Sequence, residues 1–323
     1  MKRRTLLQAA ALAFANASDF AHAQTAWPTK PIRIIAPFAP GGGPDILARL
    51  FAQEMSAGFG NAFVENRGGA GGNVGADAVA KSAPDGYTLL LTTTATQSIN
   101  PALYASMPYD AAKDFTPIAL VATTPLMLVA APQAPYKSVP ELLAAAKAEP
   151  DKITFASAGP GTMQHIAAEL FEAQANVKLT HVPYKGSSQV MPDLMSNRVN
   201  IMFNSVAALA PFVKDGRLRP IAVTSAKRLA SWPDVPTVAE AGLANFEASA
   251  WYALFGPANL PRDVVLKLNR EAQRIIDLPA TRERYAALGL EAAKSTPEEL
   301  GAIAKQDLAK WTRVIREKNI KAE

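Results

Sequence analysis

The sequence contains no cysteine and only three histidines among its 323 residues. The absence of cysteine excludes a disulfide scaffold, a thiolate nucleophile, iron–sulfur clusters and cysteine-ligated zinc. His22 lies in an N-terminal leader, and His165 and His181 are too far apart for a metalloprotease-type motif. We therefore expect neither a metal centre nor a bound cofactor.

The chain also lacks an apolar run of the roughly 20 residues that a membrane-spanning helix requires. The apolar segment 6–15 instead follows a basic start and precedes Ala21-His22-Ala23. This order is typical of a secretory signal peptide, so we expect residues 1–23 to be removed and an exported, soluble protein to begin at Gln24. The pair Arg3-Arg4 leaves the Sec and twin-arginine export routes both open.

Positive charge is in only slight excess. The sequence carries 33 Lys and Arg residues against 28 Asp and Glu, and loss of residues 1–23 leaves 30 against 27, a net charge of +3. A nucleic-acid-binding domain usually shows a strongly basic patch or stripe. We therefore do not expect nucleic acid as a partner.

Short β-branched runs alternate with helical segments along the mature chain, which is the pattern of an α/β fold. In the first third we expect strands at residues 32–36, 63–65 and 87–91, and helices at 44–55 and 73–81. The third strand is almost continuously apolar, as for a strand that is buried on both faces of its sheet.

The same layout follows a second time, after the long apolar stretch 118–131. A strand is expected at 153–156, then a glycine turn, then a helix at 162–174. We interpret the repeat as a second domain. The predicted boundaries are 24–123 and 249–323 for domain 1, which is discontinuous, and 124–248 for domain 2.

Two later segments have the spacing of a capping box, in which a Thr and a Glu three residues apart begin a helix. Thr237 with Glu240 predicts a helix that ends at Gly242, and Thr296 with Glu299 predicts the long C-terminal helix. Residues 251–255 between them are expected to form the strand that returns the chain to domain 1.

The first of three small-residue turns spans residues 37–45 and connects a predicted strand to a predicted helix. Its glycines permit close backbone approach, and the helix N-terminus presents unpaired N–H groups with a partial positive charge. The turn is therefore a candidate anion site built from backbone alone. A tight turn without a ligand remains the alternative. No Gly-Lys-Ser/Thr follows, which excludes a P-loop.

The second turn, residues 67–75, nearly matches the dinucleotide fingerprint G-x-G-x-x-G. Val74 stands where the third glycine belongs, and no acidic residue follows at the required distance of about 20 positions. We therefore predict a turn that packs beneath the first one.

The third turn runs from Ser157 to Thr162 and again joins a strand to a helix. Thr162 is expected either to cap that helix or to meet an anionic ligand. In open α/β sheets, ligands bind beyond the carboxyl ends of the strands, where the first and third turns both lie. We predict that these two turns form the two lips of one binding cleft.

No set of catalytic residues is visible. Ser157 does not lie in a G-x-S-x-G elbow, and His165 is expected to pack or to form a hydrogen bond rather than to act as a base. Asp45 is assigned to the helix N-terminus, with recognition of a ligand amino group as the alternative. Lys185 and Arg67 are interpreted as surface or structural charges. We therefore assign no catalytic and no metal-binding residues.

Six ordered motifs resemble the Bug proteins, the extracytoplasmic solute receptors of tripartite tricarboxylate transporters. The resemblance covers essentially the whole mature chain. The matching segments are 27–45, 64–72, 84–89, 109–118, 181–186 and 235–242.

The resemblance implies a two-domain periplasmic binding protein of type II. Such a protein closes like a flytrap on a small carboxylate, with a β-sheet flanked by helices in each domain. It also implies a periplasmic location, a membrane permease as partner and a monomeric state. Pro44 departs from the Thr or Ser expected before Asp45. Carried over by position, the expected ligand-binding residues are Phe38, Ala39, Gly41, Gly42 and Gly43 in the first lip, Thr93, Thr94 and Gln97 on the floor, Ser157, Gly159, Gly161 and Thr162 in the second lip, and Asn204 and Ser205 on the domain 2 wall.

Two other functional classes remain open. A ligand-sensing receptor for a signalling partner has the same sequence features, and an enzyme on the same two-domain frame is the less favoured reading because no catalytic set is present. The sequence does not distinguish among aliphatic di- or tricarboxylates, acidic amino acids and aromatic acids as the ligand.

Overall fold

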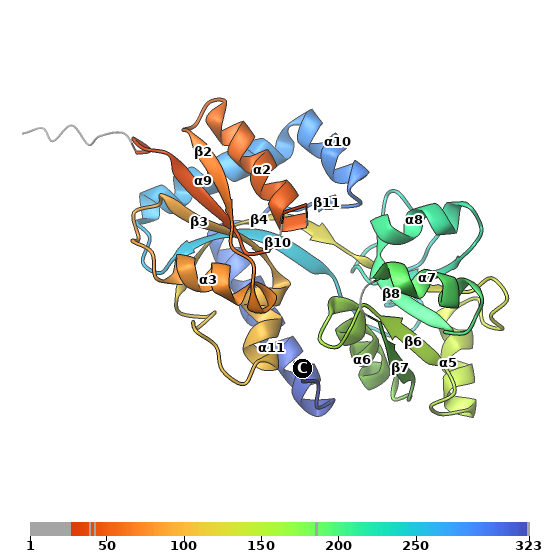
Figure 1. Ribbon diagram of the computed structural model, residues 1–323. Coiled ribbons are helices and arrows are strands. Elements are labelled where there is room, and N and C mark those ends of the chain that lie inside the picture. Colours follow the sequence, from red (N-terminus) through yellow and green to blue (C-terminus); the bar gives the residue numbers. More distant parts are fainter. Residues whose placement is uncertain (1–26, 39, 42, 185–186, 322–323) are drawn as a thin grey trace, which may run out of the picture.

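The computed structural model describes residues 27–38, 40–41, 43–184 and 187–321, and the predicted signal peptide lies outside them. Two β-sheets form two lobes, each with helices on both faces (Figure 1). The predicted α/β class with one flanked sheet in each half is confirmed. None of the helices in the described ranges is long and apolar enough to cross a membrane.

The first sheet has six strands in the order β11-β4-β10-β3-β1-β2. The three N-terminal strands are parallel, and β10 lies antiparallel between β3 and β4. Strand β10 therefore returns the chain into the first sheet after the second lobe has been completed. The strands are β1 (Ile32–Ala36), β2 (Ala62–Asn66), β3 (Thr88–Thr93), β4 (Phe115–Thr124), β10 (Ala250–Pro257) and β11 (Glu291–Ala292).

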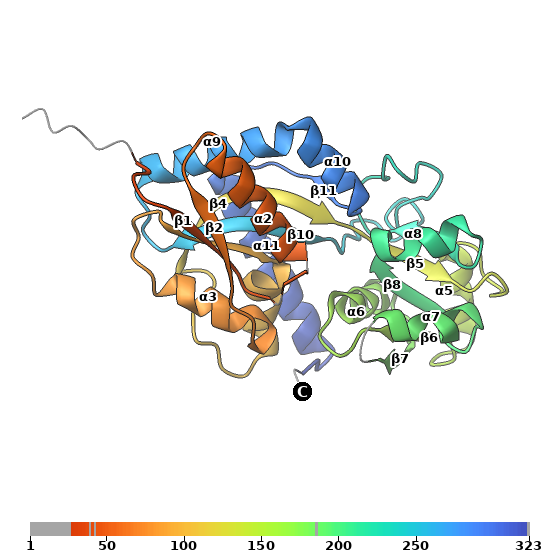
Figure 2. The ribbon, with the colours of Figure 1, turned by 45° about the horizontal axis from the view of Figure 1, so that its top comes forward.

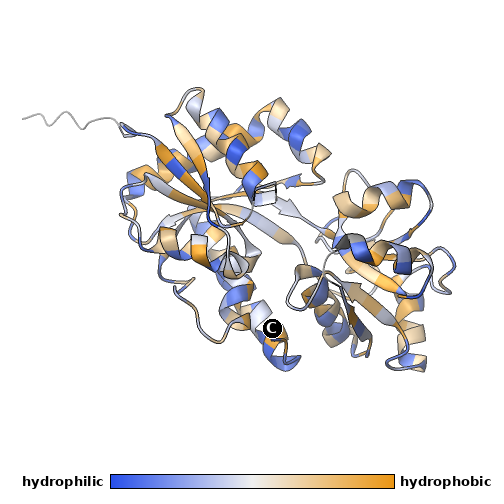
Figure 3. Ribbon diagram, viewed as in Figure 1, coloured by the Kyte–Doolittle hydropathy of each residue, from blue (hydrophilic) through white to orange (hydrophobic). Residues whose placement is uncertain are grey.

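Two layers of helices cover this sheet. Apolar side chains of α2 and α9, with Tyr285 of α10, pack on one face, and those of α3 and the start of α11 pack on the other. The strands are mostly hydrophobic in Figure 3, as burial on both faces requires. The helices are α2 (Gly43–Ser56), α3 (Asn73–Ala80), α9 (Arg262–Asp277), α10 (Pro279–Ala287) and α11 (Pro297–Glu317), with the short η1 (Ala70–Gly72), η2 (Ala95–Ile99) and α4 (Asn100–Leu103) between strands.

The second sheet has five strands in the order β7-β6-β8-β5-β9. Helices α5 and α6 pack on one face, and α7 and α8 on the other. The strands are β5 (Leu126–Ala130), β6 (Thr154–Ser157), β7 (Thr180–Pro183), β8 (Ile201–Ser205) and β9 (Arg219–Val223), and the helices are α5 (Val139–Ala148), α6 (Met163–Ala175), α7 (Ser187–Met195) and α8 (Val206–Lys214).

Helix α11 belongs to both lobes. Leu300, near its start, packs in the core of the first lobe, whereas Trp311, Val314 and Ile315, near its end, pack in the core of the second. Figure 2 shows the helix running beneath the first sheet toward α6. The chain thus joins the lobes at three places, the β4–β5 crossing, the crossing before β10 and α11, although the sequence indicated only the first two.

The two predicted capping boxes have different outcomes. Both Thr296 and Glu299 form the reciprocal hydrogen bonds of the box, and α11 follows as expected. Thr237 and Glu240 form the same pair of bonds, but the chain makes only a turn there. The helix predicted at this place is wrong, because the segment bridges to β9: the Val223 N–H donates to the Pro236 carbonyl, and the Val238 N–H donates to the Val223 carbonyl.

Candidate functional site

The first lip connects β1 to α2 and is held by hydrogen bonds to Asp45. This buried carboxylate accepts hydrogen bonds from the Gly41 N–H at 2.9 Å, the Asn66 side-chain amide at 2.8 Å and Arg49 at 3.1 Å. Burial alone would raise the pKa of Asp45, but the bonds from Arg49, Gly41 and Asn66 outweigh it and hold the pKa below the usual value. The predicted role of Asp45 at the helix N-terminus is confirmed.

The glycine-rich turn at 67–75 supports the first lip. A Cβ on Gly72 would lie 2.7 Å from a methyl group of Thr96 and 3.0 Å from the ring of Phe38, and one on Gly75 would lie 2.7 Å from Cα of Pro37. The turn and the start of α3 therefore pack directly against the lip, as predicted, and only glycine permits that approach. Of the first-lip residues expected to bind ligand, Ala39 and Gly42 lie outside the described residues.

The second lip is closed by its own hydrogen bonds. The Gly159 N–H donates to Oγ of Ser157 at 3.1 Å, the Thr162 hydroxyl donates to the Gly159 carbonyl at 2.7 Å, and the Gly161 N–H donates to Nδ1 of His165 at 3.1 Å. The backbone N–H groups of Gly159 and Gly161 are thus committed within the lip. The Thr162 hydroxyl, expected as a cap or a ligand contact, makes no capping bond to α6.

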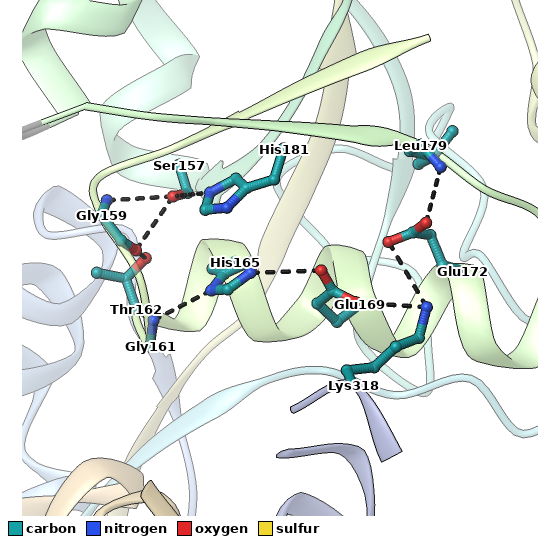
Figure 4. A network of polar contacts seen from close by, with 10 residues as sticks. All are labelled: Ser157, Gly159, Gly161, Thr162, His165, Glu169, Glu172, Leu179, His181 and Lys318. Carbon is teal, nitrogen blue, oxygen red and sulfur yellow. Dashed lines mark hydrogen bonds and ion pairs between the residues drawn. The ribbon is translucent and has the colours of Figure 1, made fainter. Parts of the chain in front are cut away.

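A pair of stacked imidazoles stands behind this lip (Figure 4). The rings of His165 and His181 lie 3.9 Å apart at 9°, and Nε2 of His181 lies 2.7 Å from Oγ of Ser157. Burial, and then the neighbouring His165, lower the pKa of His181 to about 4. His181 is therefore neutral at neutral pH.

The polar network extends from the lip to the C-terminal helix. Because Nδ1 of His165 accepts the Gly161 N–H, the ring hydrogen lies on Nε2, which faces Glu169 at 3.3 Å. Lys318, just after α11, lies 3.4 Å from Glu169 and 3.8 Å from Glu172. Burial raises the pKa of Glu172 to about 7, although its carboxylate accepts the Leu179 N–H. This series of polar contacts, which runs from Gly161 through His165 and Glu169 to Lys318, holds the second lip in place.

His165 packs and forms hydrogen bonds, as predicted, but its bond to the lip was not predicted. The available signal was spacing, since Gly161, His165 and Glu169 follow one another at intervals of four. Residues four apart on a helix are neighbours.

The expected floor residues have different surroundings. Thr93 is partly exposed, and its hydroxyl accepts the Ala95 N–H at 3.1 Å. Thr94 is buried and accepts the Trp251 N–H at 2.9 Å, which ties β3 to the strand that returns from the second lobe. Gln97 is 2% exposed and lines a cavity of about 330 Å³ with residues of β4, β10 and α11. The structure therefore does not bring Gln97 together with the lips.

The expected wall residues lie beside the second lip. Asn204 is buried, and its Oδ1 accepts hydrogen bonds from the Gln164 side chain at 3.1 Å and the Ser205 N–H at 2.8 Å. Ser205 caps α8 through a bond from the Ala208 N–H. Asn204 thus contacts the first turn of α6, whereas the Ser205 hydroxyl has a structural use.

A cavity of about 590 Å³ lies between α11 and the second crossing, and none of the expected ligand-binding residues lines it. At its wall the Trp251 indole donates to Asp307 at 2.7 Å, and Lys310 pairs with the same carboxylate. Within the described ranges, no group of three or more His, Asp or Glu is placed to hold a metal ion.

Comparison with known proteins identifies the family of this chain. Residues 47–320 match the family described as the tripartite tricarboxylate transporter family receptor. The chain belongs to this family of receptors. Protein BugT of Bordetella pertussis is 35% identical over 297 residues, which cover 91% of each chain, so the resemblance to the Bug proteins is confirmed.

Two solved structures are similar over nearly their whole length. The R. palustris protein Rpa4515, determined with adipate, is 32% identical, with a TM-score of 0.75 over 91% of this chain and 99% of that one. MatC of Rhodopseudomonas palustris, determined with bound malate, is 32% identical, with a TM-score of 0.71 over 90% of this chain and all of that one. The expected two-domain periplasmic-binding-protein fold is therefore confirmed.

Proposed function

We propose that this receptor captures a small carboxylate between its two lips and delivers it to the permease of a tripartite tricarboxylate-type transporter. The observation that carries the proposal is the repeated geometry. The N-termini of α2 and α6 follow the carboxyl ends of β1 and β6, one in each lobe, on the sides that approach each other in Figures 1 and 2. Helix N-termini attract carboxylates because their N–H groups are unpaired and partly positive.

The charge around the lips supports an anionic ligand. Asp45, the carboxylate nearest the first lip, is engaged by three donors and is only 3% exposed. Thr162, the N-cap residue of α6, makes no side-chain capping bond, so its hydroxyl does not occupy the positive end of this helix. The relatives determined with adipate and with malate hold ligands of the expected class.

An enzyme would need the Ser157–His181 pair to act as nucleophile and base, because these two side chains lie within hydrogen-bond distance. Three features argue against this use. Ser157 is completely buried, its hydroxyl is shared with the backbone of Gly159, and the pKa of His181 near 4 makes the ring a poor base at neutral pH. We therefore assign the pair to lip structure and propose no catalysis.

We propose residues 24–123 and 249–323 as domain 1 and 124–248 as domain 2, and the presence of two separate sheets supports this division. Ligand closure would rotate the lobes about the crossings near 122–124 and 248–251, and α11, which packs in both cores, would limit that rotation.

Calorimetric titration of the mature protein with malate and adipate tests the proposal, with the corresponding diamides as controls. We expect saturable 1:1 binding of at least one dicarboxylate, a rise in melting temperature that grows with ligand concentration, and no new product by NMR. Turnover of the ligand would instead favour an enzyme. A signalling receptor would bind equally well, but deleting the permease genes would leave ligand uptake by cells unchanged.

Export forms a separate part of the proposal. We propose that the protein is cleaved after Ala23 and lies in the periplasm as a monomer. Intact mass spectrometry of the periplasmic fraction should give a chain that begins at Gln24, and a soluble chain that retains residues 1–23 would contradict this.

A further inference from the structure

Tyr252 is the third residue of β10 and directly follows the second crossing. It pairs with Thr93 of β3 and with Ala122 of β4 in antiparallel register. Directly paired residues of antiparallel strands project their side chains to the same face of a sheet. Tyr252 and Thr93 therefore share the face that α2 and α9 cover, and the Tyr252 ring packs against the core of that layer.

The hydroxyl of Tyr252 reaches the first residue of α2. A Cβ built on Gly43 would clash with the hydroxyl oxygen and would lie 2.9 Å from Cζ of the ring. Gly43 is the first residue of α2, and any larger side chain at this position would have to displace the phenol. The hydroxyl of Tyr252 therefore lies at the N-terminus of α2, the helix that follows the first lip.

No hydrogen bond to this hydroxyl is present in the described part of the chain, and Tyr252 is partly exposed. The hydroxyls of Tyr136 and Tyr285 also lack partners, but they are buried. Burial of the ring raises the pKa of Tyr252, so the phenol keeps its proton and remains a donor. A protonated phenol at a helix N-terminus complements an ionised carboxylate.

We propose that Tyr252 is a ligand-contacting, specificity-determining residue, whose hydroxyl donates a hydrogen bond to the carboxylate held at the N-terminus of α2. The inference rests on the proposed function and deepens it, because it assigns this site a donor from a third segment of the chain besides the two lips. It favours a carboxylate over a neutral amide, since hydrogen bonds with a charged partner are the stronger ones.

The test compares Tyr252→Phe with Tyr285→Phe by calorimetric titration of malate and adipate. Tyr285 is the matched control, because its unpartnered hydroxyl is buried in the core of the same lobe. For a dicarboxylate that the wild type binds, we expect Tyr252→Phe to raise Kd about 10-fold or more, as for a lost bond to a charged group. Tyr285→Phe should stay within about twofold, by the same reasoning.

Three outcomes separate the claims. Unchanged affinity of Tyr252→Phe, with wild-type binding intact, overturns the assignment and leaves the proposed function standing. Absence of binding by the wild type to every carboxylate overturns the proposed function, and the assignment with it. Weaker binding by Tyr252→Phe counts as support only if its melting temperature matches that of Tyr285→Phe.

A double-mutant cycle gives a second test. Gly43→Ala places a methyl group against the hydroxyl and should weaken binding by displacing the phenol. Removing that hydroxyl in Tyr252→Phe relieves the closest contact, so the alanine should be less harmful there than in the wild type. Strictly additive losses would contradict a shared role for the two residues.

Discussion

The two lips have the same hydrogen-bond pattern, but the side chains that form it differ in charge. In each lip a glycine N–H donates to the side chain four residues later, Gly41 to Asp45 and Gly161 to His165. Each acceptor is held in turn by a residue four positions further on, Asp45 by Arg49 and His165 by Glu169. The first lip uses a carboxylate held by a cation, and the second uses an imidazole held by a carboxylate.

The ring of His181, stacked on His165, makes the second lip the pH-sensitive one. Neutral His181 lies within hydrogen-bond distance of Oγ of Ser157, and a protonated His181 would present only donors to it. The carboxylate of Asp45 in the first lip has a lowered pKa and remains an acceptor when the pH falls through the range in which His181 titrates.

The largest expected effect is on the first lip. Asp45→Ala leaves the Gly41 N–H and the Asn66 amide without their buried acceptor, and we expect a loss of about 2–4 kcal/mol in the free energy of unfolding. Urea denaturation measures it. The control Asp215→Ala removes an exposed ion pair with Arg217 and should change stability by less than about 0.5 kcal/mol. Equal effects of both variants would mean that Asp45 does not fasten the lip.

The second lip should be less costly to break. His165→Leu removes the acceptor of the Gly161 N–H and the stack on His181, and we expect a loss of about 1–2 kcal/mol by the same measurement. His165→Asn keeps an oxygen near the place of Nδ1 and should recover part of the loss. A leucine variant as stable as the wild type would show that the imidazole is dispensable.

Acid should loosen the second lip first. The pKa of His181 is lowered to about 4 in the folded state from an ordinary 6.5, so its contribution to stability is full above pH 6.5 and is lost between pH 6.5 and 4. Because the ring is partly exposed, solvent screening reduces the loss to about 1–2 kcal/mol. The lowered pKa of Asp45 means that its own contribution is lost only at more acidic pH.

The matching experiment compares the stability of the wild type and His181→Phe across that range. Glu172, whose pKa is raised to about 7, acts in the opposite direction and stabilises the fold as the pH falls, but it is present in both proteins. The difference between the two curves therefore isolates His181. Curves that stay parallel from pH 6.5 to 4 would contradict the pH sensitivity of the second lip.

The smallest effect is expected from Thr162→Ala. The hydroxyl donates to the Gly159 carbonyl within the lip and makes no capping bond, so its loss should cost about 0.5–1.5 kcal/mol of stability. Thermal denaturation measures this loss. A cost above 3 kcal/mol would mean that the hydroxyl holds more than the turn.

Local pattern was enough to predict the parts of the site that depend on neighbours in sequence. The strand–glycine–helix turns, the role of Asp45 and the supporting turn at 67–75 all follow from turn chemistry and helix capping. The partners of His165 at intervals of four were within reach of the same reasoning, because Glu169 lies on the same helix and Gly161 lies just before its start.

Contacts between distant segments could not be read from one sequence. Tyr252 meets Gly43, and Trp251 meets Thr94, only because β10 enters the first sheet beside β3. For the same reason, helix α11 could not be recognised as a third connection between the lobes. The π-helical turn at η2, which directs Gln97 toward a cavity lined by β4, β10 and α11, has no sequence signature that capping or periodicity would detect.

In the proposed function, two helix N-termini hold an ionised carboxylate between the lobes. Calorimetric titration of the mature protein at pH 7.5 with malate and adipate, and with their diamides, tests this arrangement. We expect saturable 1:1 binding of at least one of the two acids and binding at least tenfold weaker for its diamide. Equal affinity for an acid and its diamide, or no binding of either acid, would contradict it.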